Sequence, residues 1–252
     1  MARSTRNSAT AAVPPERLDL AVLLLALVLP TAVTWVYFVA LDGAPASWQQ
    51  TAYGVGKTLQ FALPVAWIVG MRRGWPTLVA PHGIWLGVGA GVGLAIAAAM
   101  AAIYFAAMKP AGLFTAPAAA ITAKVNSFGA GSALLFALLG LFYSLLHSLL
   151  EEYYWRWFVF GELTRWRPWT QAAAISSLAF AAHHVLVLAH YFGPAAPLTW
   201  LFTAAVAAGG TIWAWIYWRS GCLWSVWLSH ALVDAAIFAL GYDIVFRSAV
   251  GS

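Results

Sequence analysis

The sequence has few charged residues and almost no cysteine. Only 8% of its 252 residues are charged, whereas a soluble domain carries about 25%. The single cysteine, Cys222, excludes an intramolecular disulfide and any CxxC metal or redox site. Its basic residues are scattered, with no run of five or more. The formal charge of +5 therefore does not indicate nucleic-acid binding.

Apolar residues fill the chain instead. They make up 63% of it, and the mean hydropathy is +0.80, which excludes disorder. A spanning helix needs about 20 apolar residues, so the sequence predicts an all-α, polytopic membrane bundle of about seven to eight transmembrane helices. Seven segments are predicted: Leu20–Leu41, Leu59–Met71 (with a possible start near Tyr53), Ile84–Met108, Gly131–Leu150, Ala172–Tyr191, Leu198–Trp218 and Leu223–Leu240.

The remaining segments suggest how the chain lies in the membrane. Residues 1–18 are polar and predict a cytoplasmic tail. Residues 19–252 are predicted to form a single membrane domain. Within it, residues 112–130 are less apolar and predict an interfacial or re-entrant piece. A signal peptide ending near Ala44-Pro45-Ala46 is a less favoured alternative, because the first apolar segment is too long for one.

The basic residues predict the orientation. With the N-terminus inside, eight arginines lie inside and four basic residues outside, as the positive-inside rule requires. We therefore expect a multi-pass protein of the bacterial inner (cytoplasmic) membrane with a cytoplasmic N-terminus. The inside set is Arg3, Arg6, Arg17, Arg72, Arg73, Arg165, Arg167 and Arg219, and the outside set is Lys57, Lys109, Lys124 and Arg247.

Ionisable residues gather in the apolar helices of the second half. Each such group costs at least about 2.5–3.5 kcal/mol in a membrane, so the default interpretation is a buried functional site. Several pairs have the i,i+4 spacing that brings side chains together on one helix face. A site in a bundle is built in this way, from facing helices. The pairs are His147–Glu151, Glu152–Arg156, Phe180–His184 and His230–Asp234.

These residues resemble the motifs of a known family. Glu151-Glu152-Tyr-Tyr-Trp-Arg156 matches EExxxR, Phe180-Ala-Ala-His183-His184 matches FxxxH, and His230-Ala-Leu-Val-Asp234 matches HxxxN/D. In this order, on successive hydrophobic helices, they are similar to the CPBP (Abi) family of CAAX-processing and bacteriocin-processing intramembrane endopeptidases. The resemblance covers residues 131–240, which form a CPBP-like catalytic core.

The resemblance implies a glutamic-type protease without a cofactor or metal. It implies that Glu151 is the base that activates water and that His184 holds this water. His230 and Asp234 would stabilise the oxyanion. Glu152, Arg156, Phe180 and His147 are the supporting residues, and His183 is interpreted as packing. The eukaryotic prenyl-protein members of the family usually have Asn where this chain has Asp234, and an ionised Asp cannot donate a hydrogen bond.

Other functions remain open. The histidines and Glu151 could instead bind Zn²⁺ as in a zinc-dependent membrane protease, although HExxH is absent. Intramembrane acids also serve as proton relays, so a transporter or a non-proteolytic scaffold is a further alternative, and His pairs could ligate haem. The expected partners are a membrane-associated protein or peptide substrate and the lipid bilayer, with no nucleic acid. The substrate and the oligomeric state cannot be predicted.

Overall fold

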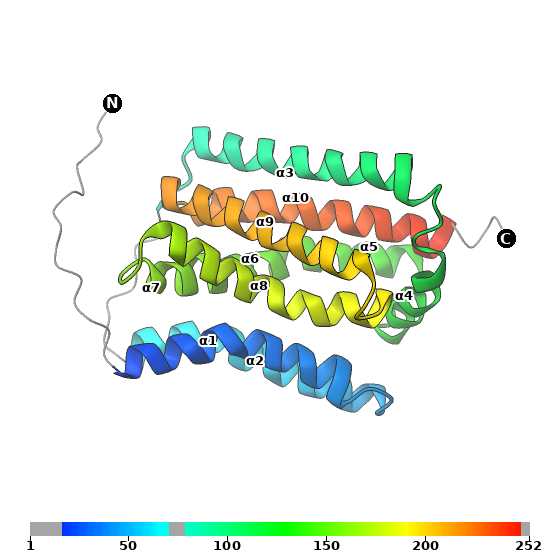
Figure 1. Cartoon of the computed structure of the whole chain (residues 1–252), viewed down its shortest axis with the longest axis horizontal. Coiled ribbons are helices and arrows are strands. Elements are labelled where there is room, and N and C mark those ends of the chain that lie inside the picture. The colour runs from blue at the N-terminus through cyan, green and yellow to red at the C-terminus, as the bar shows by residue number, and fades with distance from the viewer. Residues whose placement is uncertain (1–16, 71–78, 248–252) are drawn as a thin grey trace.

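The protein is described by a computed structural model covering residues 17–70 and 79–247. These residues form helices joined by turns and include no strand (Figure 1). Most of the predicted tail, residues 1–16, lies outside the described residues, as do Met71, Arg72 and Arg73. The helices are α1 (Arg17–Trp35), α2 (Ala46–Gly70), α3 (Gly83–Ile103), α4 (Thr115–Ser127), α5 (Ala133–Phe142), α6 (Ser148–Glu152), α7 (Gly161–Leu163), α8 (Trp169–Phe192), α9 (Pro197–Ser220) and α10 (Leu223–Tyr242).

Five short π-helical segments extend or join these helices. η1 (Val36–Ala40) extends α1, η2 (Tyr104–Met108) extends α3, and η5 (Asp243–Arg247) extends α10. The other two join α5, α6 and α7 into one long helix. They are η3 (Tyr143–His147) and η4 (Tyr153–Phe160).

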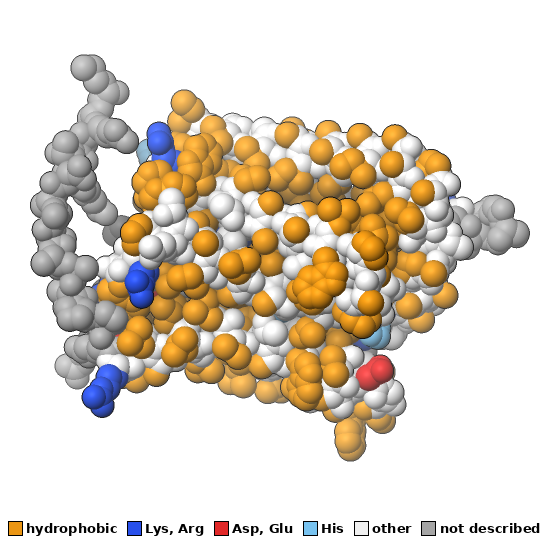
Figure 2. All heavy atoms as spheres, in the orientation of Figure 1, with side chains coloured by type: hydrophobic (Ala, Val, Ile, Leu, Met, Phe, Trp, Pro, Cys, Tyr) orange, Lys and Arg blue, Asp and Glu red, His pale blue; other side chains and the backbone are white. Residues whose placement is uncertain are grey.

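Six of the described helices are long and apolar enough to cross a membrane. They are Arg17–Ala40, Gly83–Met108, Ala133–Leu163, Trp169–Phe192, Pro197–Ser220 and Leu223–Arg247. Hydrophobic side chains dominate the face shown in Figure 2, and fewer than half of the residues in each of these spans are buried in the bundle. In a membrane protein this outer surface contacts lipid. The chain is therefore a multi-pass integral membrane protein.

Six of the seven predicted segments correspond to these spans, so the predicted number of about seven to eight was too high for the described residues. The seventh segment, Leu59–Met71, falls in α2, which is not among the six, and several boundaries were also wrong. α2 begins at Ala46, thirteen residues before the predicted Leu59, because Gln49, Gln50 and Lys57 lower the hydropathy of its first half. The predicted Gly131–Leu150 segment continues to Leu163, since the polar pair Glu151–Glu152 interrupts the apolar run but not the helix. Residues 115–127 form the separate short helix α4, which is too short to span a bilayer.

Successive long helices run in opposite directions along one axis (Figure 1). α1 packs against α2 and α8, α8 packs against α9, and α10 packs against α3, which lies at the opposite edge of the bundle from α1 and α2. One end of the bundle carries Arg17, Arg165, Arg167 and Arg219, and the other carries Lys109, Lys124 and Arg247. Lys57 belongs to neither end, because it lies inside α2.

Two glycines allow α3 to approach α10 closely. A Cβ atom added at Gly89 would lie 2.0 Å from the carbonyl oxygen of Ser225, and one at Gly93 would lie 2.8 Å from that of Ser229. Real Cβ atoms do not approach backbone so closely, so these positions require glycine. The contact supports α10 at Ser229, directly beside His230.

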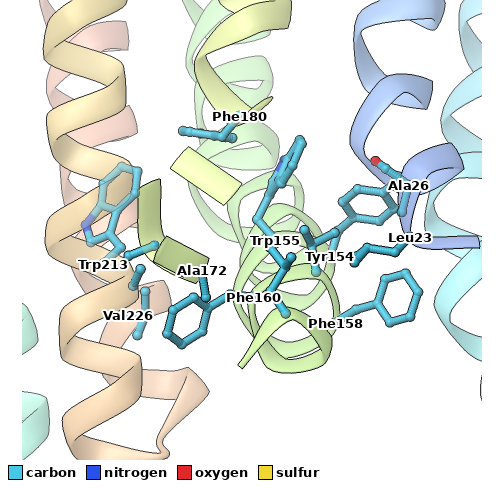
Figure 3. Packing of buried hydrophobic residues seen from close by; sticks show 14 of the residues in the cluster. Leu23, Ala26, Tyr154, Trp155, Phe158, Phe160, Ala172, Phe180, Trp213 and Val226 are labelled. Carbon is cyan, nitrogen blue, oxygen red and sulfur yellow. The ribbon is translucent and has the colours of Figure 1, made fainter. Parts of the chain in front are cut away.

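The core lies where α1, η4, α8, α9 and α10 meet (Figure 3). Pro30 interrupts α1 and, having no N–H, leaves the carbonyl of Ala26 without its helical partner. Tyr154 of η4 is fully buried and donates to that carbonyl oxygen at 2.7 Å. This hydrogen bond satisfies the freed carbonyl and joins α1 to the helix that carries Glu151 and Glu152.

Candidate active site

The helix that runs through Ala133–Leu163 positions the paired glutamates. Glu151 and Glu152 lie in the short α-helical stretch α6, with the π-helical η3 before it and η4 after it. π-helical segments inside α-helices occur frequently at functional sites, because they redirect the side chains around the helix axis. Glu151 is 4% exposed and Glu152 0%, so both carboxyl groups point into the bundle.

Glu152 is held by a buried arginine. Its Oε1 accepts a hydrogen bond from Nη1 of Arg156 at 2.9 Å, and Nη2 of Arg156 lies 3.4 Å from the carbonyl oxygen of Gly210 on α9. The guanidinium also lies over two aromatic rings, 4.7 Å from the centroid of Phe180 and 5.1 Å from that of Trp213. These contacts join the glutamate helix to α8 and α9 and indicate a supporting role.

His230 of α10 links both glutamates to Asp234. Its Nδ1 donates to Oε1 of Glu152 at 2.7 Å, and its ring stacks on Trp213 with centroids 4.1 Å apart. These contacts fix the ring so that Nε2 faces the other two carboxyl groups. It lies 3.5 Å from Oδ1 of Asp234 and 3.9 Å from Oε2 of Glu151.

Glu151 lies at the centre of a ring of imidazoles. His147 Nε2 and His183 Nε2 are each 3.8 Å from its Oε1, and His230 Nε2 is 3.9 Å from its Oε2. None of the described residues donates a hydrogen bond to this carboxylate. Its lone pairs are therefore available to another donor, and three imidazole nitrogens lie within 4 Å of its oxygens.

The two adjacent histidines of α8 are oriented differently. Half-buried His184 donates from Nδ1 to the carbonyl oxygen of Phe180 at 2.9 Å, while its ring lies 4.1 Å from that of His183. His183 is 5% exposed, stacks parallel to Trp155, and is the α8 histidine at 3.8 Å from Glu151. Sequence reasoning treated His183 as packing. Its i,i+3 spacing from Phe180 places it on the same helix face and was the signal available.

His147 lies one turn before Glu151 on the same helix. Its ring packs on Tyr143 at 4.8 Å and near Phe61 of α2 at 6.3 Å. The structure therefore brings together His147, Glu151, Glu152, Arg156, Phe180, His184, His230 and Asp234, all of the sequence-predicted site residues, and adds His183 and Trp213 to them.

Zinc needs protein ligands at about 2.0–2.2 Å from one ion. Within residues 17–70 and 79–247, no group of three His, Cys, Asp or Glu side chains is arranged to hold a metal ion.

Comparison with known protein families identifies the segment that carries this site. Residues 132–236 match the family model described as type II CAAX prenyl endopeptidase, Rce1-like. This range includes every residue of the three motifs and confirms the resemblance that they indicated. No curated protein and no solved structure matches the chain.

Proposed function

Because residues 132–236 form an Rce1-like type II CAAX prenyl endopeptidase family (CPBP/Abi) domain, we propose that this chain is an intramembrane endopeptidase in which Glu151 activates water. It hydrolyses peptide bonds of membrane-associated proteins or peptides. The observation that carries the proposal is the buried Glu151 carboxylate with three imidazole nitrogens within 4 Å.

Amide hydrolysis needs a base, a positioned water and donors for the developing oxyanion. The Glu151 carboxylate accepts a proton from water as the water attacks the substrate carbonyl. His183 or His184, from the adjacent turn of α8, orients this water. The proton on Glu151 then passes to the leaving amine, which restores the carboxylate.

The oxyanion group is supplied by α10. Nε2 of His230 faces the site, and its Nδ1 is held by Glu152, so the ring has a fixed direction. Asp234, 3.5 Å from the same nitrogen, orients the imidazole when ionised and donates a hydrogen bond itself only when protonated. His230, protonated on both ring nitrogens, is therefore the principal donor in this chain, with Asp234 as its support.

The charge distribution supports a cytoplasmic N-terminus. Among the described residues, four arginines lie at the end of the bundle where α1 begins. Three basic residues lie at the opposite end, where α4 is also found. We propose an inner-membrane protein in which residues 19–252 form one membrane domain. Glu151 is twelve residues from Leu163 and eighteen from Ala133, which places it nearer the cytoplasmic end.

The test begins with a proteomic comparison of membranes with and without the protein, which identifies a substrate by its cleavage. The purified protein and its Glu151→Gln variant are then assayed on that substrate. Gln keeps the shape of the side chain but lacks the basic oxygen, so we expect cleavage to be lost and the thermal unfolding temperature to be retained.

The matched control is Glu162→Gln on the same helix, where the side chain pairs with the exposed Arg165 at 2.8 Å. This variant should cleave at the wild-type rate. Full activity of Glu151→Gln would refute the assignment of the base. Loss of wild-type activity on chelation, with recovery on adding zinc, would favour the metalloprotease instead.

A further inference from the structure

Lys57 is a charged residue in the middle of α2. It is the twelfth of the 25 residues of Ala46–Gly70, so the nearer helix end is about 16 Å away along the axis. A lysine side chain cannot extend that far, so this ammonium group does not reach either end of α2. An ionisable group placed so far inside a helix of a membrane protein is a candidate functional residue.

Aromatic contacts connect Lys57 to the histidines around Glu151. Its Nζ lies 5.6 Å from the ring centroid of Tyr53 and 5.5 Å from that of Phe61, one turn away on either side. The Phe61 ring in turn lies 6.3 Å from the ring of His147, whose Nε2 is 3.8 Å from Glu151. Lys57 interacts electrostatically with Glu151 and with the histidines around it.

The one arginine in the cluster is already paired with Glu152 and not with Glu151. Glu151, Glu152 and Asp234 are three carboxyl groups in one cluster. The guanidinium of Arg156 is bonded to Glu152. Lys57 is the other permanent cation near the cluster. Among the described residues it forms no hydrogen bond and no ion pair within 4 Å, so its charge is not neutralised by a closer partner.

Other titratable groups face Glu151 from each element packed around it. Lys57 and Arg156 are the permanent cations among these groups, and Arg156 is already bonded to Glu152. The groups are Tyr53 and Lys57 of α2, Tyr143 and His147 of η3, Glu152 of α6, Arg156 of η4, His183 and His184 of α8, and His230 and Asp234 of α10.

We propose that Lys57 is a positioning residue of the active site, whose ammonium group holds Glu151 in the ionised form that can accept a proton. The proposal rests on the proposed role of Glu151 as the base. α2 lies outside the matched 132–236 segment, so this contribution comes from the N-terminal half of the chain.

The experiment follows the Glu151 carboxyl group itself. In the purified protein in lipid nanodiscs, the carboxyl band of Glu151 is identified by infrared spectroscopy as the band absent from Glu151→Gln. Its conversion between acid and carboxylate is then titrated in the wild type, Lys57→Met and Lys57→Arg. Lys57→Gln provides a second neutral variant. Both neutral substitutions remove a charge from the bundle, so they should not impair insertion.

We expect the midpoint of this titration to rise by about one pH unit or more in Lys57→Met, as for loss of a nearby opposite charge. Lys57→Arg should titrate as the wild type does. The matched control is Lys124→Met. Lys124 is also a lysine held over an aromatic ring, with its Nζ 4.0 Å from the centroid of Tyr37, but it lies in α4. It should leave the midpoint unchanged.

Once a substrate is known, the acid limb of the pH–rate profile should move in the same direction and by the same amount. A wild-type midpoint in both neutral variants would overturn the proposal, as would a shift in Lys57→Arg equal to that in Lys57→Met. A failure of the proposed function is a different result: the Glu151→Gln variant would then cleave the substrate, whatever the titration of the Lys57 variants shows.

Discussion

At the scale of single residues, the stability of the site depends on one buried ion pair. Arg156 and Glu152 are 2% and 0% exposed. Removing one partner of such a pair leaves the other charge buried, at a cost of about 3–5 kcal/mol. We therefore expect Arg156→Ala to lower the yield of folded protein and its unfolding temperature, measured in detergent, more than it lowers the activity of each folded molecule.

Arg165→Ala is the matched control for Arg156→Ala. Arg165 pairs with Glu162 at 2.8 Å on the same helix, but its side chain is 46% exposed. Exposed pairs contribute about 0–1 kcal/mol, so this variant should unfold within a few degrees of the wild type. Equal stability of both variants would contradict the assigned supporting role of Arg156.

The residues of the site were largely predictable, because three motifs place them at one-turn spacing. Two were not. His183 and His184 are adjacent, and spacing alone does not decide which nitrogen faces Glu151, since that depends on how α8 is rotated against Trp155. Lys57 was counted among the outside residues because the Gln49–Lys57 stretch is polar, whereas the observed start of α2 puts it inside a helix.

At the scale of helices, the contact between α3 and α10 positions His230. We expect Gly89→Ala to push α10 away, because the added Cβ would lie 2.0 Å from the Ser225 carbonyl oxygen. Overpacking of this kind costs about 1–3 kcal/mol. Thermal unfolding of the purified variant measures the loss.

Gly91→Ala tests the same chemical change on the other face of α3, where an added Cβ meets nothing within 4 Å. Alanine is favoured over glycine in a helix by about 1 kcal/mol, so this variant should be as stable as the wild type or more so. The contact would be refuted if Gly89→Ala were equally stable.

At the scale of the whole molecule, hydropathy predicted the helical bundle and the order of its helices, since apolar runs and membrane spans have the same length. It did not predict how the two halves cooperate. Tyr154 bonds to the carbonyl freed by Pro30, and Phe61 packs near His147. These contacts depend on the tertiary arrangement of α1 and α2 around the glutamate helix, which no local pattern encodes.

The central claim is that Glu151 acts on water as a base. The measurement that tests it most directly is substrate cleavage in water enriched in oxygen-18, followed by mass spectrometry of the product and of the enzyme peptide containing Glu151. A general base transfers protons only, so the label should enter the new carboxyl terminus in the first turnover and remain absent from Glu151 after many turnovers. Label in the Glu151 carboxyl group would show a covalent intermediate and contradict the account.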